Sequence, residues 1–113
     1  LADYKSRLEI LRSRLEELGF LFDLAGKDEA IRELEARLAQ PEVWQDARRA
    51  AEIGRKLAEL REERERFTAL ERQVEELYQF WELAVEEGEE SLAEEVAAAL
   101  AAAERRLDAA EIE

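Results

Sequence analysis

The sequence contains no cysteine, histidine or methionine, and it has a single proline and four glycines among 113 residues. Without cysteine the chain can form no disulfide, no thiolate nucleophile and no thiolate ligand for a metal. Without histidine it lacks the commonest general base and the commonest ligand of transition metals. No glycine-rich phosphate loop is present either. These absences argue against an enzyme, and we assign no catalytic, cofactor-binding or metal-binding residue.

Long apolar segments and a starting methionine are also missing. No apolar run approaches the roughly 18 to 20 residues that cross a membrane as a helix, and no signal-peptide pattern opens the chain. We therefore expect a cytoplasmic protein that makes no membrane contact. The length of 113 residues predicts a single helical domain. The lack of methionine even at position 1 suggests that this domain is excised from a longer protein, which we expect to continue past Glu113.

Negative charge dominates what is present. Asp and Glu number 30 against 17 Lys and Arg, which gives a net charge of −13. A surface with this charge is repelled by phosphate backbones and by anionic lipid. We expect the chain to contact proteins, or to contact a ribonucleoprotein through a local basic patch, and we expect no sequence-specific binding of nucleic acid.

The first helical segment carries a narrow apolar stripe at the period of a coiled coil. Its members follow one another at intervals of four, three, four and three residues: Tyr4, Leu8, Leu11, Leu15 and Leu18. Gly19 is expected to end this helix. The next window, FLFDLAG at residues 20–26, is too apolar for a solvated loop and predicts a corner that packs inward.

A second helix is predicted over residues 27–39, and one face of it carries three apolar residues: Ile31, Leu34 and Leu38. Pro41 disfavours helix at the residue before it and suits the first position of a new turn. The stretch PEVW should therefore form a single helical turn that directs Val43 and Trp44 back towards the helices. Trp44 should fix the angle of this corner, and Asp46 should cap a third helix.

The third helix is predicted over residues 47–86, which contain no proline. Apolar residues recur along it at intervals of seven: Ile53, Leu60, Phe67, Val74 and Trp81. Leu57 follows four residues after Ile53, whereas Leu70 follows three after Phe67, so the apolar face rotates near Phe67. The helix should change partners there. Gly54 costs about 1 kcal/mol relative to alanine inside a helix and suggests close packing.

Gly88 is expected to end the third helix, and Ser91 with Glu94 matches a capping box that opens a fourth. Alanines at 97–99 and 101–103 should let the fourth helix lie close to a neighbour. Its apolar face is formed by Leu92, Val96, Leu100, Ala103 and Leu107. A short turn at Gly88 makes the last two helices an antiparallel hairpin. The predicted fold is all-α, a helical bundle with a long antiparallel helical hairpin.

Three groups of residues are candidate sites, and a structural explanation is favoured for each. An acidic cluster lacks the alternating oxygen ligands of a calcium loop and predicts a solvated hinge: Glu86, Glu87, Glu89 and Glu90. A basic run is interleaved with glutamates, which favours salt-bridged helix surface over an RNA contact: Arg48, Arg49, Arg55, Lys56, Arg61, Arg64 and Arg66. An aromatic group is favoured to pack rather than to stack on bases: Tyr78, Phe80 and Trp81. We assign no partner-binding residue.

Two stretches carry a family resemblance. FDLAGKDEAIRELEARLAQPEVWQD at residues 22–46 and LYQFWELAVEEGEESLAEEV at residues 77–96 resemble the N-terminal domain of the bacterial peptide chain release factor 2 family. The most specific elements are the corner from Pro41 to Trp44 and the run ELAVE from Glu82 to Glu86. The glycine and basic residue in AEIGRKL, residues 51–57, add to the likeness.

The resemblance implies a role in translation termination at UGA and UAA stop codons. Factors of this class resemble one another in using a Gly-Gly-Gln loop for peptidyl-tRNA hydrolysis, and these 113 residues contain no Gly-Gly-Gln. No catalytic residue is therefore carried over. The resemblance further implies contact with the ribosome at the stalk base and the small-subunit head, and an interplay with the class II release factor GTPase. No cofactor is implied.

A general coiled-coil scaffold or homodimerisation module is the alternative. It predicts a continuous apolar seam and self-association. The corner at Pro41 and Trp44 and the rotating face near Phe67 favour a self-packed monomer instead.

Overall fold

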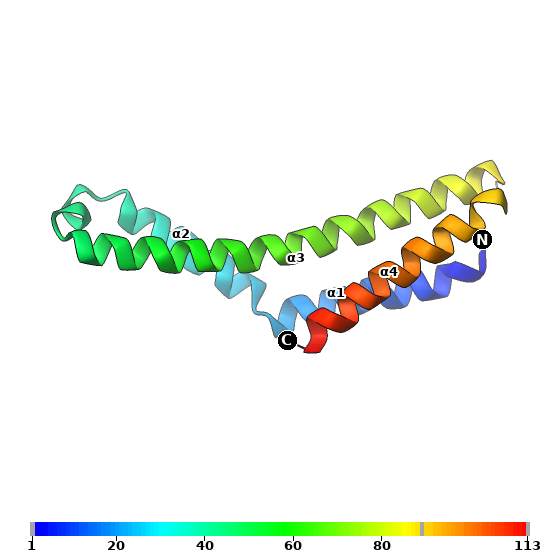
Figure 1. The fold of residues 1–113 in the computed structure, drawn as a ribbon, viewed down its shortest axis with the longest axis horizontal. Helices are drawn as coiled ribbons and strands as arrows, with labels where there is room; N and C mark the ends of the chain where they lie inside the picture. Colours follow the sequence, from blue (N-terminus) through cyan, green and yellow to red (C-terminus); the bar gives the residue numbers. More distant parts are fainter. Residues whose placement is uncertain (1, 89, 113) are drawn as a thin grey trace. The chain divides into compact units, whose positions relative to one another are not determined.

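The computed structural model describes residues 2–88 and 90–112. This part of the chain holds four α-helices and no strand: α1 (Lys5–Leu21), α2 (Leu24–Leu38), α3 (Ala47–Glu87) and α4 (Ala93–Ile112) (Figure 1). Short 3-10 turns lie at Ala2–Tyr4, Pro41–Gln45 and Glu90–Leu92. The predicted all-α fold with a helical hairpin is confirmed, and α3 ends within one residue of its predicted end.

The chain forms two compact units, and α3 contributes to both. The second unit is Phe22–Phe67, and the first comprises the segments up to Leu21 and from Thr68 onwards. The boundary falls at Phe67, where the apolar face of α3 rotates, so the prediction that α3 changes partners at this point is confirmed. The organisation of residues 1–113 as a single domain stays a prediction.

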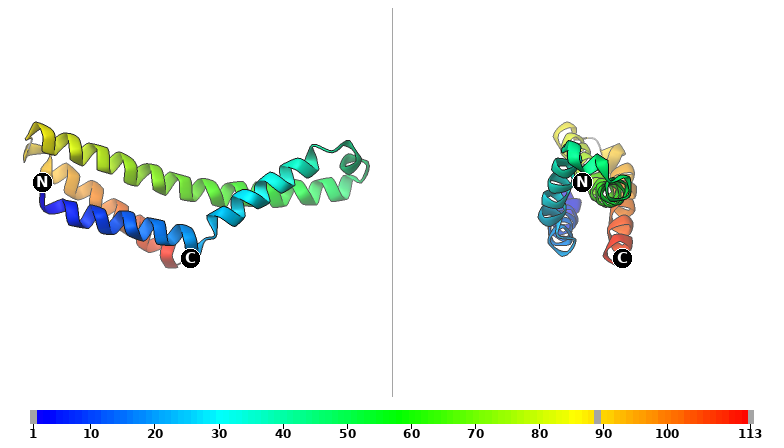
Figure 2. Two further views of the ribbon diagram at one scale, coloured as in Figure 1. Left: turned by 180° about the vertical axis from the view of Figure 1, so that it is seen from behind. Right: turned by 90° about the vertical axis from the view of Figure 1, so that its left-hand side faces the viewer.

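The first unit packs α1, α4 and the second part of α3 around a core of aliphatic side chains. Figures 1 and 2 show α1 and α4 lying side by side, and Cα atoms of the two helices approach within 8 Å. This close approach agrees with the predicted effect of the alanines on α4. Residues that are at most 8% exposed form the α1 and α4 sides of the core: Leu8, Leu11, Leu15, Leu18, Val96, Leu100, Ala103 and Leu107.

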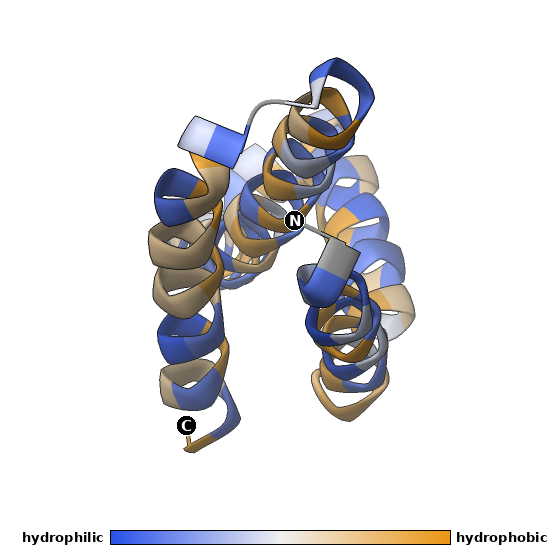
Figure 3. Cartoon of the chain, turned by 90° about the vertical axis from the view of Figure 1, so that its right-hand side faces the viewer, coloured by the Kyte–Doolittle hydropathy of each residue, from blue (hydrophilic) through white to orange (hydrophobic). Residues whose placement is uncertain are grey.

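The second unit pairs α2 with the first part of α3 (Figure 2). Five residues of α3 in this unit are at most 8% exposed: Ala50, Ile53, Leu57, Leu60 and Phe67. The rings of Phe22 and Phe67 meet edge to face with centroids 6.3 Å apart. The predicted apolar face of α2 is only half-buried, at Ile31, Leu34 and Leu38. Each helix of a two-helix unit has one neighbour, so its apolar stripe keeps an open edge. Hydrophobic and hydrophilic residues alternate along the helices (Figure 3), as amphipathic helices require.

The segment between α1 and α2 differs from its prediction. Gly19 does not end α1, which continues to Leu21, and the predicted inward packing is wrong for Phe20 and Leu21, which are 80% and 75% exposed. The helix is interrupted instead at Asp23, whose φ of 51° is left-handed. Aspartate tolerates this conformation better than most residues, and its carboxylate accepts from Gly26 N at the start of α2. The second helix therefore begins at Leu24, three residues before its predicted start.

Three further glycine and capping predictions can be compared with the structure. Gly88 ends α3 with φ 65°, as predicted. Ser91 lies within the 3-10 turn Glu90–Leu92, and α4 begins at Ala93, two residues after the predicted cap. The expected close packing at Gly54 is wrong, because a Cβ atom there would meet nothing within 4 Å.

Candidate partner-binding surfaces

The corner between α2 and α3 is a tight turn built on the only proline of the sequence. Gln40 has an extended backbone (φ −87°, ψ 122°), which is the conformation that a following proline favours. Pro41 then begins the 3-10 turn Pro41–Gln45, with Val43 N donating to Gln40 O at 3.2 Å and Asp46 N to Val43 O at 3.2 Å. The predicted single turn of helix is confirmed.

Trp44 fixes this corner through a hydrogen bond and leaves its ring in solvent. The indole Nε1–H donates to Leu38 O at 2.8 Å, and so supplies a partner to a carbonyl at the C-terminal end of α2. The side chain therefore reaches back to α2 as predicted, but the residue is 61% exposed and is not packed between the helices. Val43 is the half-buried member of the turn. The sequence predicts that Trp44 holds the corner but does not predict its exposure. The apolar pattern does not show that the second unit has only two helices to cover the ring.

Asp46 completes the corner by capping α3. Its carboxylate Oδ1 accepts from Arg49 N at 3.2 Å, and its carbonyl accepts from Ala50 N at 3.0 Å. Both bonds satisfy N–H groups that have no partner inside the helix. The predicted cap is confirmed, and it places Arg48 and Arg49 in the first turn of α3, directly after the corner.

The basic run of α3 forms ion pairs, as the interleaved glutamates predict. Two residues of this run form ion pairs with α2: Arg61 with Glu35 at 2.6 Å and Arg64 with Asp28 at 2.8 Å. Three longer pairs run along α3: Arg48–Glu52 at 3.9 Å, Lys56–Glu59 at 3.7 Å and Arg66–Glu62 at 3.7 Å. The salt-bridged interpretation is therefore confirmed for these five residues.

Several arginines of the second unit remain available for a partner. Within residues 2–88 and 90–112, no side-chain ion pair is made by four of them: Arg32, Arg37, Arg49 and Arg55. The second unit contains ten basic and twelve acidic residues, whereas the rest of the chain contains seven and eighteen. The net charges are thus −2 and −11, so the repulsion of phosphate expected from the composition is concentrated in the first unit.

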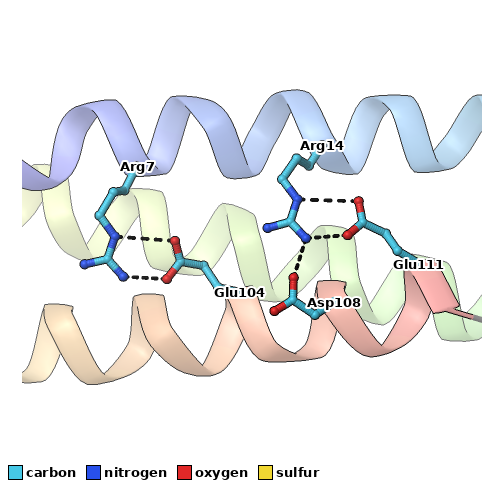
Figure 4. A network of polar contacts seen from close by, with 5 residues as sticks. All are labelled: Arg7, Arg14, Glu104, Asp108 and Glu111. Atoms are coloured by element: carbon cyan, nitrogen blue, oxygen red, sulfur yellow. Dashed lines mark hydrogen bonds and ion pairs between the residues drawn. The ribbon is translucent and has the colours of Figure 1, made fainter.

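The first unit uses its arginines to join its helices (Figure 4). Arg7 of α1 bonds Glu104 of α4, with Nη2 2.5 Å from Oε1. Arg14 bonds Asp108 at 2.6 Å and also bonds Glu111. Hydrogen bonding to Glu104 raises the pKa of Arg7, and hydrogen bonding to Glu111 and Asp108 raises the pKa of Arg14. Both guanidinium groups are thereby held in the charged form, which suits a structural contact between helices and not acid–base chemistry.

The aromatic group Tyr78, Phe80 and Trp81 lies on α3, and Arg12 of α1 contacts it at Tyr78. The prediction that this group packs is confirmed. Tyr78 is 8% exposed, with the guanidinium of Arg12 3.6 Å from its ring centroid and the ring of Trp81 edge-on at 6.3 Å. Arg12 also pairs with Glu75 at 3.4 Å. Phe80 and Trp81 are half-buried.

The acidic cluster at the end of α3 does not assemble into a site in the part of the chain that the structure describes. Glu86, Glu87 and Glu90 are exposed, and Glu89 lies outside the described residues. Over residues 2–88 and 90–112 no three acidic side chains converge as metal ligands would. In the same residues no helix is both long and apolar enough to span a bilayer. The surfaces left to a partner are therefore the exposed helix faces and the corner at Trp44.

Comparison with known proteins gives consistent matches. The family model described as the PCRF domain matches residues 27–113. Peptide chain release factor 2 of Chloroflexus aggregans is 38% identical over 113 residues, which are all of this chain and 31% of that protein. The same factor of Aliivibrio fischeri is 34% identical over 103 residues, 91% of this chain and 28% of that protein. Peptide chain release factor 2 of Yersinia pseudotuberculosis is 36% identical over 97 residues, which are 85% of this chain and 26% of that protein. The chain thus spans less than a third of the length of these curated relatives.

Proposed function

This chain belongs to the PCRF domain family, and from this we propose that it is the N-terminal accessory domain of a class I peptide chain release factor. The resemblance to release factor 2 read from the sequence is confirmed by the three relatives. The proposed role is in termination of translation at UGA and UAA codons in the cytoplasm. The family match over residues 27–113 is the observation that carries the proposal.

In this proposal the domain supplies binding and no chemistry. The sequence has no histidine, no cysteine and no Gly-Gly-Gln. The pKa of Arg7 and of Arg14 is raised, so neither serves as a proton acceptor near neutral pH. Peptidyl-tRNA hydrolysis and codon reading would then belong to parts of the factor outside these 113 residues.

The proposed partner is the ribosome near the stalk base and the small-subunit head, with the class II release factor GTPase as a further partner. The uneven charge supports contacts of two kinds. The first unit, with a net charge of −11, suits basic protein surfaces, because it is repelled by ribosomal RNA. The second unit has a net charge of −2 and unpaired arginines, so it is repelled much less by ribosomal RNA.

A monomer is proposed in preference to a homodimerisation module. The narrow leucine stripe of α1 is the segment that a coiled-coil dimer would use as its seam. That stripe is buried within the chain, at 8% exposure or less for Leu8, Leu11, Leu15 and Leu18. The chain therefore uses the stripe for its own core.

The test is a termination assay with purified bacterial ribosomes and an intact release factor 2. The chain should sediment with ribosomes and, in excess, should slow peptide release by the intact factor through competition. On its own it should release no peptide. The matched control is Leu100→Asp, which places a charge at a fully buried core position and should abolish competition by unfolding the first unit. Failure of the unmodified chain both to sediment with ribosomes and to compete would overturn the proposal.

A further inference from the structure

We propose that the corner of residues 37–49 is an RNA-binding site, at which the ring of Trp44 stacks on an unpaired base and Arg37, Arg48 and Arg49 contact the neighbouring phosphates. This inference rests on the proposed function, since it names the ribosomal component that this corner would touch.

The ring of Trp44 is presented in a way that suits stacking. Its N–H is already used by Leu38 O at 2.8 Å, so the remaining exposed surface is the apolar face and edge of the indole. The 3-10 turn and Pro41 fix the backbone on which the ring sits. An exposed aromatic side chain whose position is set in advance loses little conformational entropy on binding. Each base that stacks on such a ring strengthens binding whatever its identity, because every base has a π-face.

The charge around Trp44 is opposite in sign to that of the chain as a whole. Residues 37–49 contain three arginines and two acids, Glu42 and Asp46, for a net charge of +1 in a chain of −13. The carboxylate of Asp46 is occupied in capping α3. Arg37 and Arg49 make no ion pair with any residue that the structure describes. Arg37 and Leu38 belong to the last turn of α2, where the indole is hydrogen-bonded.

Arg48 is also available at little cost. Its side chain is 92% exposed, and its contact with Glu52 is long, at 3.9 Å. Exposed pairs of this kind contribute almost nothing to stability, so a phosphate can replace the glutamate. Arginine presents a planar fork of donors that matches phosphate geometry.

An acidic protein segment is the competing occupant, and the observations favour RNA over it. A protein hot spot buries its tryptophan in a packed pocket and pairs it with apolar neighbours. Here Trp44 is the only large hydrophobic side chain that is exposed among residues 37–49, and the same residues include three exposed arginines. An aromatic platform flanked by cations is the arrangement that single-stranded nucleic acid recognises without sequence preference.

The first experiment measures binding of a fluorescein-labelled single-stranded RNA of about ten nucleotides by anisotropy at low salt. Trp44→Leu, which removes the ring, should weaken binding roughly 5- to 150-fold. Trp44→Phe, which keeps a ring but loses the hydrogen bond to Leu38, should retain most of the affinity. The double change Arg48→Gln with Arg49→Gln should flatten the slope of log affinity against log salt by about 1.4, since each phosphate contact on a single strand contributes about 0.7.

Arg55→Gln is the matched control. Arg55 is exposed, makes no ion pair among the described residues and lies further along α3. Its substitution removes one positive charge away from the corner, for comparison with the single change Arg49→Gln. It should leave the affinity and the salt slope near those of the unmodified chain. Circular dichroism checks that every variant is folded. Equal losses for Arg55→Gln and Arg49→Gln would show diffuse attraction and overturn the inference.

A second readout separates RNA from protein. In a Trp81→Phe background Trp44 is the only tryptophan, and stacking of a base on it should quench its fluorescence. Quenching by RNA and no response to a poly-glutamate peptide is the expected result. A response to the acidic peptide alone, or to neither probe, would overturn the inference.

Ribosome sedimentation distinguishes failure of this inference from failure of the proposed function. If the unmodified chain binds ribosomes and Trp44→Leu binds equally well, the RNA site is wrong while the release-factor role stands. If the unmodified chain binds RNA through Trp44 but neither binds ribosomes nor slows release, the site stands and the proposed function is wrong. Loss of ribosome binding in Trp44→Leu, with Arg55→Gln unaffected, supports both.

Discussion

Replacing each of three glycines by alanine should change the stability of the chain in three different ways, because the three lie in different backbone settings. Gly54 lies inside α3, without positive φ, and a Cβ atom there would meet nothing within 4 Å. Alanine adds helix propensity and lowers the entropy of the unfolded chain. Gly54→Ala should therefore stabilise the second unit by about 1 kcal/mol.

Gly88 and Gly26 provide the contrast. Gly88 has φ 65°, a conformation that costs an alanine roughly 1 to 2 kcal/mol, so Gly88→Ala should destabilise by about that amount. At Gly26 an added Cβ would lie 2.1 Å from Asp23 Oδ2. Making room would displace the carboxylate that caps α2, which costs about 1 kcal/mol and offsets the gain in helix propensity. Gly26→Ala should thus be close to neutral.

The assay is urea unfolding followed by circular dichroism at 222 nm, with each variant measured beside the unmodified chain. Thermal midpoints should follow the same order, with about 4 °C for each kcal/mol in a chain of this size. The free energy of unfolding should be higher for Gly54→Ala than for the unmodified chain, nearly unchanged for Gly26→Ala and lower for Gly88→Ala. If Gly54→Ala is neutral or destabilising, or if Gly88→Ala is tolerated without loss, the backbone assignment behind this reasoning is wrong.

Three other predictions follow from the core, the ion pairs and the oligomeric state. Leu100→Ala, at a fully buried position of α4, should destabilise the chain by roughly 3 to 5 kcal/mol in urea unfolding, whereas Leu83→Ala, at a residue 49% exposed, should cost less than about 1 kcal/mol. The pKa of Arg14 is raised above its ordinary value, so the contribution of its ion pairs to the free energy of unfolding is fully present below that value and is lost only at higher pH. The difference in free energy of unfolding between Arg14→Gln and the unmodified chain should therefore stay constant from about pH 7 to 9. A difference that varies within this range would contradict these ion pairs. Sedimentation equilibrium should give the mass of a monomer, 13.1 kDa, independent of concentration, and a mass that rises with concentration would favour the homodimerisation module.

The sequence predicts those features that depend on local chemistry. The proline, the aspartate cap and the glycine at position 88 each act within one turn of helix, and all three are found where they were expected. The rotation of the apolar face near Phe67 also has a local signature, since it is visible as a change of spacing. Periodicity therefore located the point at which α3 changes partners.

Exposure could not be predicted in the same way, because it depends on how many neighbours a segment has. Phe20, Leu21 and Trp44 are apolar and were expected to pack inward, yet they are 80%, 75% and 61% exposed. Gly19 illustrates a second limit: it resembles a helix terminator, but the next residues continue α1 to Leu21. The turn at Asp23 has a local signal, an aspartate three residues before a glycine, which the surrounding apolar residues mask.

The pairing of α1 with α4 determines the order in which the two units can form while the chain is being synthesised. The ion pair between Arg7 and Glu104 joins residues 97 positions apart, and the residues of the second unit, Phe22–Phe67, lie wholly between them. The contiguous α2–α3 pair can therefore form as soon as it emerges, because closing it needs only short loops. Of the four helices, α1 emerges before the others, and its partner α4 emerges after them. Until α4 has been synthesised, the leucines of α1 have no partner helix on that side, and the nascent chain exposes this stripe to chaperones.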